Sequence, residues 1–222
     1  MNSLGSRMAY DKAKQAINNA GFSASQAVLS QGYLRMEVAL STSKTTYQFP
    51  ILQNDNTNGA AFNTENRLAL QDAFYVSSLA LFFCKPSSST DTTFQLVTYP
   101  NASIFSTSNC ATSLFTWYNS SLQLIVNNRQ IIPSYDLYRH YSSPQTQTTT
   151  NADYTSSGIS YKDQQSGADS GFYPVEPGWV LVGSKNNTLS VNLPSSMTAV
   201  ETNSRAVIIV RGHLAQNVTP VR

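Results

Sequence analysis

From residue 33 onward, apolar and polar side chains alternate in short runs. Leu34, Met36 and Val38 are separated by Arg35 and Glu37, and residues 47–51 alternate in the same way. A period of two places successive side chains on opposite faces of a β-strand, so one face is buried and the other meets water. The pattern therefore predicts strands of an antiparallel fold over most of the chain.

Two longer segments rich in apolar residues predict further strands. The strand at 74–84 is expected to be covered on both faces, and the strand at 205–214, in which 206–210 is the most hydrophobic segment, is expected at the centre of a sheet. Asn127 and Asn128 predict a tight turn. We expect 179–182 and 189–193 to form a hairpin across 184–187. Further strands are expected at 94–99, 114–118, 122–126 and 130–132, with 136–141 continuing the last of them.

Residues 8–30 carry the one pattern of helical period. Apolar residues recur there at spacings of three and four, which places them on one helix face. Gly21 is expected to break the helix, and Ser23 to cap a second short one. The face is mostly alanine and buries little area by itself, so the helix needs a partner surface. Its members are Tyr10, Ala13, Ile17, Ala20, Ala24, Ala27 and Val28.

Short strands without a βαβ alternation predict an antiparallel β-sandwich or barrel. We expect a helical arm at 1–32 and a sandwich at 33–222, interrupted by a long polar excursion at 142–177 with a short strand near 159–161. One eight-stranded sandwich with elaborated loops is favoured over two fused barrels, because sixteen strands leave little room for turns.

Uncharged polar residues dominate the composition. Ser, Thr, Asn and Gln number 31, 21, 19 and 14, whereas charged residues make up only 12%. Such residues compete with a helix backbone for hydrogen bonds, which disfavours a helical protein. The net charge of +2 excludes an extensive coat of phosphate contacts. Arg7, Lys12 and Lys14 in the arm could give a weak contact with nucleic acid or an anionic lipid surface, or simply a solvated helix face.

Residues that carry chemistry are scarce. His140 and His213 have no Cys, Asp or Glu near them at metal-ligand spacing, and the glycine patterns of phosphate sites and nucleophile elbows are absent from the sequence. Asp163 and Asp169 do not match a calcium loop. We therefore expect no catalytic centre, metal site or cofactor. A disulfide between Cys84 and Cys110 is left open, and neither a membrane span nor a signal peptide is expected.

Aromatic residues gather in and beside the polar excursion. Tyrosine offers contact area and a hydroxyl group at a low entropic cost, which suits either a subunit interface or a carbohydrate or receptor contact. The low charge of the chain favours the interface, because interface cores are depleted in charge. The candidates for such loop contacts are Tyr138, Tyr141, Tyr154, Tyr161, Phe172 and Tyr173.

Three short strings carry a resemblance to a known class of proteins. They are Tyr-Leu-Arg-Met-Glu-Val-Ala-Leu from residue 33, Thr-Tyr-Gln-Phe-Pro-Ile-Leu from 46 and Thr-Glu-Asn-Arg-Leu-Ala-Leu-Gln-Asp-Ala-Phe from 64. Together with the basic arm and the late polar loop, they resemble jelly-roll coat proteins of bacteriophages, including lipid-containing phages of Bacteroidetes-type hosts. The resemblance implies a jelly-roll sandwich, with a compact double jelly-roll as the alternative, in a shell of trimers or pentamers. It also implies an arm that faces the genome or an internal membrane.

These observations lead us to expect a virion structural protein, a capsid-shell subunit assembled in the host cytoplasm, rather than an enzyme. Its partners would be copies of itself and other virion proteins, with no small-molecule substrate. A receptor- or glycan-binding head is the alternative, and a hydrolase using Asp163 and Asp169 as a carboxylate pair is a third hypothesis. For docking of the arm on neighbouring subunits, the expected residues are Tyr10, Ala13, Ile17, Ala20 and Val28.

Overall fold

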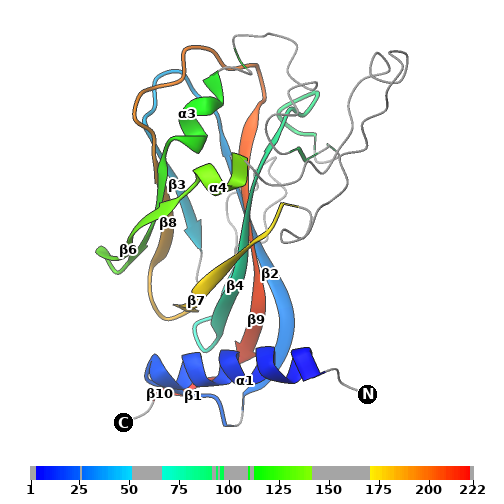
Figure 1. Cartoon of the computed structure of the whole chain (residues 1–222), viewed down its shortest axis with the longest axis vertical. Helices are drawn as coiled ribbons and strands as arrows, with labels where there is room; N and C mark the ends of the chain where they lie inside the picture. Colours follow the sequence, from blue (N-terminus) through cyan, green and yellow to red (C-terminus); the bar gives the residue numbers. More distant parts are fainter. Residues whose placement is uncertain are drawn as a thin grey trace.

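The chain folds into a mainly β structure in which two antiparallel four-stranded sheets face each other and one helix lies near the N-terminus (Figure 1). The molecule is known from a computed structural model. It describes residues 4–25, 27–51, 67–91, 94, 96–97, 110, 113–141 and 171–220. The prediction of an antiparallel β-sandwich with an N-terminal helix is confirmed.

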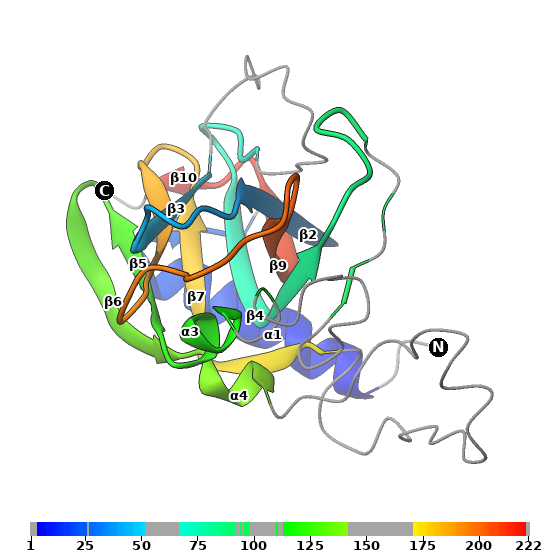
Figure 2. The ribbon, with the colours of Figure 1, turned by 90° about the horizontal axis from the view of Figure 1, so that it is seen from above.

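Each sheet is made of strands that lie far apart in the sequence. The first sheet has the order β2 (Val28–Ala39), β9 (Arg205–Gln216), β4 (Ala73–Cys84), β7 (Tyr173–Val182). The second has the order β3 (Thr46–Ile51), β8 (Asn187–Asn192), β5 (Ser121–Val126), β6 (Arg129–Asp136). Every pair of neighbours is antiparallel, and the two layers are seen edge-on in Figure 2.

The main hydrophobic core fills the space between the two layers. Leu34 and Met36 of β2, Phe49 of β3 and Ile208 of β9 all contribute to it. The strand at 47–51 alternates between buried and exposed residues as expected, and β4 is buried along most of its length. The segment 206–210 lies in β9, which pairs with β2 on one side and β4 on the other, so its predicted central position is confirmed.

Helix α1 (Leu4–Asn19) is shorter than the helical pattern suggested. Gly21 follows it with a positive φ of 88°, a conformation that glycine adopts without strain, and this ends the helix as expected. The second short helix capped by Ser23 is wrong. Ser23 lies in the two-residue strand β1 (Phe22–Ser23), which pairs with β10 (Thr219–Pro220), and Val28 already begins β2 within the segment assigned to the arm.

Helix α1 packs against the lower end of the first sheet in its own chain (Figure 1). Ile17 joins a small buried cluster with Ala24, Ala73, Ala215 and Val218. Small residues predominate in this cluster, and they allow the helix to approach the strand ends closely. The sandwich itself thus provides the partner surface that the alanine-rich helix requires.

Two predicted strand segments are helical turns. Residues 114–118 contain α3 (Phe115–Tyr118), and residues 136–141 contain α4 (Tyr138–Tyr141). Leu114, which precedes α3, is buried together with Trp117 and Tyr118, and a turn of helix allows this spacing whereas an alternating strand does not. The Asp136 carboxylate accepts a hydrogen bond of 2.8 Å from the Tyr138 backbone N–H, so β6 ends in a turn that starts α4.

The expected hairpin between 179–182 and 189–193 is also wrong. The first segment belongs to β7 in one sheet and the second to β8 in the other, so the turn between them crosses from layer to layer. The polar excursion ends earlier than expected, because β7 begins at Tyr173. Its remainder, including the strand expected near 159–161 and both Asp163 and Asp169, lies outside the described residues.

The turn at Asn127 and Asn128 is confirmed, since both residues have positive φ angles of 48° and 62° between β5 and β6. Cys84 and Cys110 are buried free thiols and form no disulfide. Burial raises the pKa of Cys84 to about 12 and also raises the pKa of Cys110, so both thiols stay protonated and unreactive at neutral pH.

Candidate assembly surfaces

A series of aromatic rings runs from the core to the surface through α3 and α4, which lie side by side. Trp117 contacts Phe83 in the core, and Phe83 contacts Tyr118, with ring centroids 5.7 Å and 5.9 Å apart. Tyr118 meets Tyr141 at 5.7 Å, and Tyr141 stacks on Tyr138 at 5.5 Å. Phe115 also contacts Tyr141, with ring centroids 5.6 Å apart. We call the four residues of the two short helices that take part in these contacts the aromatic ladder: Phe115, Tyr118, Tyr138 and Tyr141.

The outer members of the aromatic ladder meet solvent. Tyr138 is 55% exposed and Phe115 is 38% exposed, whereas Tyr118 is buried. Their positions are fixed from beneath by Tyr141 and by the short helices, so they lose little conformational freedom when a partner covers them. Rigid, exposed aromatic rings are typical anchors of protein interfaces.

Two of these four residues were expected from the sequence and two were missed. Tyr138 and Tyr141 were assigned to loop contacts, and the structure brings them together at the surface. Phe115 and Tyr118 were missed because their segment was taken for a strand. The sequence signal that identifies them is the spacing of apolar residues in 114–118, where Leu114 is followed by Trp117 and Tyr118 three and four positions later, as on one face of a helix.

The other expected loop residues have different surroundings. Phe172 is buried against Phe82, with the Arg211 guanidinium 3.6 Å from its ring centroid, so its assignment to a subunit contact is corrected. Tyr173 is half-buried and meets the ring of His140 at 5.5 Å. Tyr154 and Tyr161 lie outside the described residues.

The residues expected to dock the arm divide into two groups. Ala13 and Ile17 are completely buried within the chain, because α1 packs on its own sandwich, so they cannot contact a neighbouring subunit in this arrangement. Tyr10, Ala20 and Val28 remain exposed and available. The assignment of Ala13 and Ile17 to contacts with neighbouring subunits is therefore corrected, because both side chains pack within their own chain.

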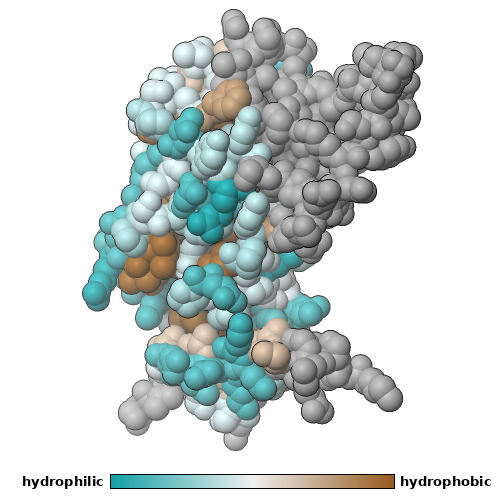
Figure 3. Space-filling view, in the orientation of Figure 1, coloured by the Kyte–Doolittle hydropathy of each residue, from teal (hydrophilic) through white to brown (hydrophobic). Residues whose placement is uncertain are grey.

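The basic residues of the arm also differ from one another. Lys12 forms an ion pair of 3.3 Å with Glu176 of β7, at the surface. Lys14 is half-buried, and Arg7 lies in the first half of α1. On the face drawn in Figure 3, hydrophilic side chains lie over much of the described part of α1, with weakly apolar areas beside them. The ion pair lowers the net positive charge that the arm can offer to an anionic partner.

The outer face of the first sheet holds a buried charge network. Glu37 lies between two guanidinium groups: Arg35 at 2.6 Å and Arg205 at 3.2 Å. Arg205 also donates to the Ser89 carbonyl oxygen at 2.8 Å, and both guanidinium groups lie over the ring of Phe94, at 5.6 Å and 5.3 Å. These contacts fasten the segment after β4 onto the sheet.

His140 belongs to the same short helix α4 as Tyr138 and Tyr141, and it is almost completely buried. Burial lowers its pKa from 6.5 to about 4, since desolvation penalises the charged imidazolium. Its Nε2 lies 3.5 Å from the Tyr135 hydroxyl, and that Tyr135 ring packs on Trp179 of β7. His140 thus couples α4 to both sheets while it stays neutral.

We expect the free energy of unfolding to fall as the pH is lowered from 6.5 toward 4. In this window the unfolded chain binds a proton at His140 and the folded chain does not. The free energy of unfolding is therefore highest above pH 6.5, and it falls by about 3 kcal/mol on acidification to pH 4. Urea denaturation near both ends of the window measures the loss. His140→Gln should remove most of this pH dependence, and an unchanged dependence in that variant would contradict the assignment.

Among the described residues, no three His, Cys, Asp or Glu side chains come together as metal ligands. His140 lies in α4 and His213 in β9. Within the described ranges, no helix has the length and apolar character needed to cross a membrane.

Comparisons with protein-family models, with curated proteins and with solved structures find no match to this chain.

Proposed function

We propose that the sandwich is a jelly roll and that the chain is a capsid-shell subunit of a virion. The strand pairing supports the fold. β2 pairs with β9, β3 with β8, β4 with β7, and β5 with β6, so the pairs are nested along the chain and fall alternately in the two sheets. A long antiparallel ribbon that is wrapped around itself gives this order, which is the arrangement of eight-stranded jelly rolls.

Fold alone does not determine function, because jelly rolls also occur in lectins and cupins. The observation that carries the proposed function is the aromatic ladder, which connects the core to exposed rings in a chain of which only 12% of the residues are charged. A standard interface buries about 1,600 Å² in total, and several such contacts around one subunit can hold a shell together without covalent links. The exposed arm residues Tyr10, Ala20 and Val28 provide a second contact region at the base.

The proposal includes the remaining partners. Arg7 and Lys14 are the arm residues that would give a weak contact with genome or internal membrane, since Lys12 is paired with Glu176. Other virion proteins would meet the same exposed surfaces. In this account the protein works by assembly rather than by turnover of a substrate.

Placing a charge in the aromatic ladder tests the proposal. We expect Tyr138→Asp to reduce assembly of the purified protein at least about tenfold, because an unpaired carboxylate at an interface core is costly to desolvate. Size-exclusion chromatography with light scattering measures the assembled fraction. Ser195→Asp, at an exposed position outside the ladder, is the matched control and should assemble normally. A wild-type chain that never assembles, or a Tyr138→Asp variant that assembles as well as the control, would contradict the proposal.

A further inference from the structure

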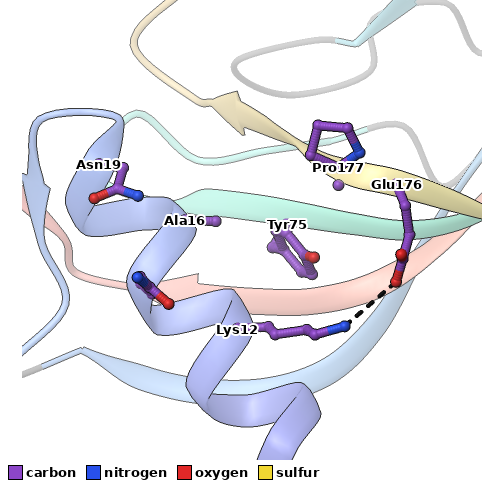
Figure 4. Close-up of a pocket in the computed structure, with 8 residues that line it drawn as sticks. Lys12, Ala16, Asn19, Tyr75, Glu176 and Pro177 are labelled. Atoms are coloured by element: carbon purple, nitrogen blue, oxygen red, sulfur yellow. Dashed lines mark hydrogen bonds and ion pairs between the residues drawn. The ribbon is translucent and has the colours of Figure 1, made fainter.

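An open cleft of about 380 Å³ lies at the base of the molecule, between α1 and the first sheet (Figure 4). Its volume is within the range of small-molecule sites. Three elements that are distant in the sequence form its walls: α1 on one side, β7 on the other and β4 at the bottom. The residues that the argument uses are Lys12, Gln15, Asn19, Tyr75, Glu176 and Gly178.

The helical wall of the cleft is a polar stripe. Lys12, Gln15 and Asn19 are spaced by three and four residues, so their side chains share one face of α1. The neighbouring stripe, which contains Ala13 and Ile17, is completely buried against the sandwich. That packing fixes the rotation of the helix, and the polar stripe is therefore held toward the cleft before any ligand arrives.

The floor of the cleft depends on a glycine. A Cβ atom at Gly178 would overlap the Tyr75 ring, so only glycine lets the β7 backbone lie directly against that ring. Tyr75 is only 9% exposed, and its ring lies between α1 and β7 (Figure 4). Within the described part of the chain, its hydroxyl group makes no hydrogen bond. A buried phenol with an unused hydroxyl at the floor of a polar cleft is a ready contact for a ligand.

The charges at the rim of the cleft neutralise each other. Lys12 Nζ lies 3.3 Å from Glu176 Oε1, and the two side chains are 60% and 74% exposed. The remaining polar groups are the two amides and the tyrosine hydroxyl, which can both donate and accept hydrogen bonds. Groups that both donate and accept hydrogen bonds bind the hydroxyl groups of a neutral ligand better than they bind an ionic ligand. A zwitterion such as an amino acid would have to break the existing ion pair, whereas a neutral ligand leaves it in place.

We propose that this cleft binds a neutral pyranose, as a free sugar or as the terminal residue of a glycan. Gln15 and Asn19 bond its hydroxyl groups from the helix, Glu176 accepts from the opposite rim, and the Tyr75 hydroxyl contacts it from the floor. The proposal rests on the geometry of the cleft and not on the aromatic ladder, and it goes beyond assembly because it gives the protein a means of attaching to carbohydrate.

Titration with methyl glycosides, followed by saturation-transfer NMR, tests the site. The probes are the methyl pyranosides of glucose, galactose, mannose and N-acetylglucosamine, each used up to about 50 mM, and binding of at least one is expected with a Kd on the order of 1 mM. Gln15→Leu together with Asn19→Leu should weaken that binding at least about tenfold while the fold is kept, because both side chains are exposed. Tyr75→Phe removes the hydroxyl alone and should weaken binding less.

Gln48→Leu, on the exposed face of β3, is the matched control and should bind as the wild type does. The absence of a saturation-transfer signal for all four glycosides would overturn the proposal. An unchanged affinity for the glycoside in the variant that carries both Gln15→Leu and Asn19→Leu would also overturn it. Preferential binding of glycine over the glycosides would also overturn it, in favour of a zwitterion site. None of these results changes the expected assembly, which is measured separately by particle size.

Discussion

Glu37→Gln is expected to lower the free energy of unfolding by about 3–5 kcal/mol. The substitution keeps the size of the side chain but removes the negative charge between Arg35 and Arg205. The Glu37 side chain is fully buried and the Arg205 side chain is 2% exposed, so water cannot replace the lost attraction. The buried Arg205 guanidinium and the partly exposed Arg35 guanidinium then face each other with no carboxylate between them.

Urea denaturation of the two proteins at neutral pH measures this loss. Glu176→Gln is the matched control, because it removes the same type of charge from the exposed pair with Lys12 and should cost less than about 1 kcal/mol. Equal losses in the two variants would show that the buried network does not fasten the segment after β4 to the sheet.

Trp117→Ala is expected to cost about 3–5 kcal/mol. Trp117 is completely buried, and its ring lies 4.7 Å from that of Tyr47 in the second sheet and 5.7 Å from that of Phe83 in the first. Its indole N–H also donates to the Met197 sulfur at 3.4 Å. Removing the ring leaves a cavity where α3 closes the space between the layers.

Thermal and urea unfolding of Trp117→Ala measure this cost. Phe115→Ala, in the same helical turn, is the comparison and should cost much less, because Phe115 lies at the surface. The Phe115 variant should instead weaken assembly. A Trp117→Ala protein as stable as the wild type would contradict the position of Trp117 between the sheets.

The strands of the sandwich could be predicted because their burial follows local sequence. Phe49 and its neighbours in β3 alternate between core and solvent. The segment 206–210 is apolar throughout because β9 is covered on both faces: Ile208 lies in the main core, and Val207 lies in a separate buried cluster that contains Phe172. The alternation of apolar and polar side chains along a strand does not depend on which strands pair with it, so it can be recognised from the sequence alone.

Pairing between strands could not be predicted in the same way. The segments 179–182 and 189–193 are adjacent in sequence and both are apolar, which is equally compatible with a hairpin and with a crossing between layers. The choice is made by distant partners: β4 for the first segment, and β3 and β5 for the second. Similarly, Leu114 and Trp117 suit a strand by composition, but the closure of the sandwich end requires a helical turn.

The candidate surfaces were found only in part. Tyr138 and Tyr141 were identified by residue type and position, whereas Phe115 joins them through a contact that depends on α3. The cleft beside α1 has no sequence signature at all, because Tyr75 and Glu176 come from strands that meet only in the folded sheet.

The central claim, that this sandwich builds closed assemblies from copies of itself, is tested most directly by the size and shape of the purified wild-type protein. Sedimentation velocity over increasing concentration, followed by electron microscopy of the largest species, gives both. The account predicts rings or shells much heavier than the 24.3 kDa chain. A single species of 24.3 kDa at every concentration would contradict it.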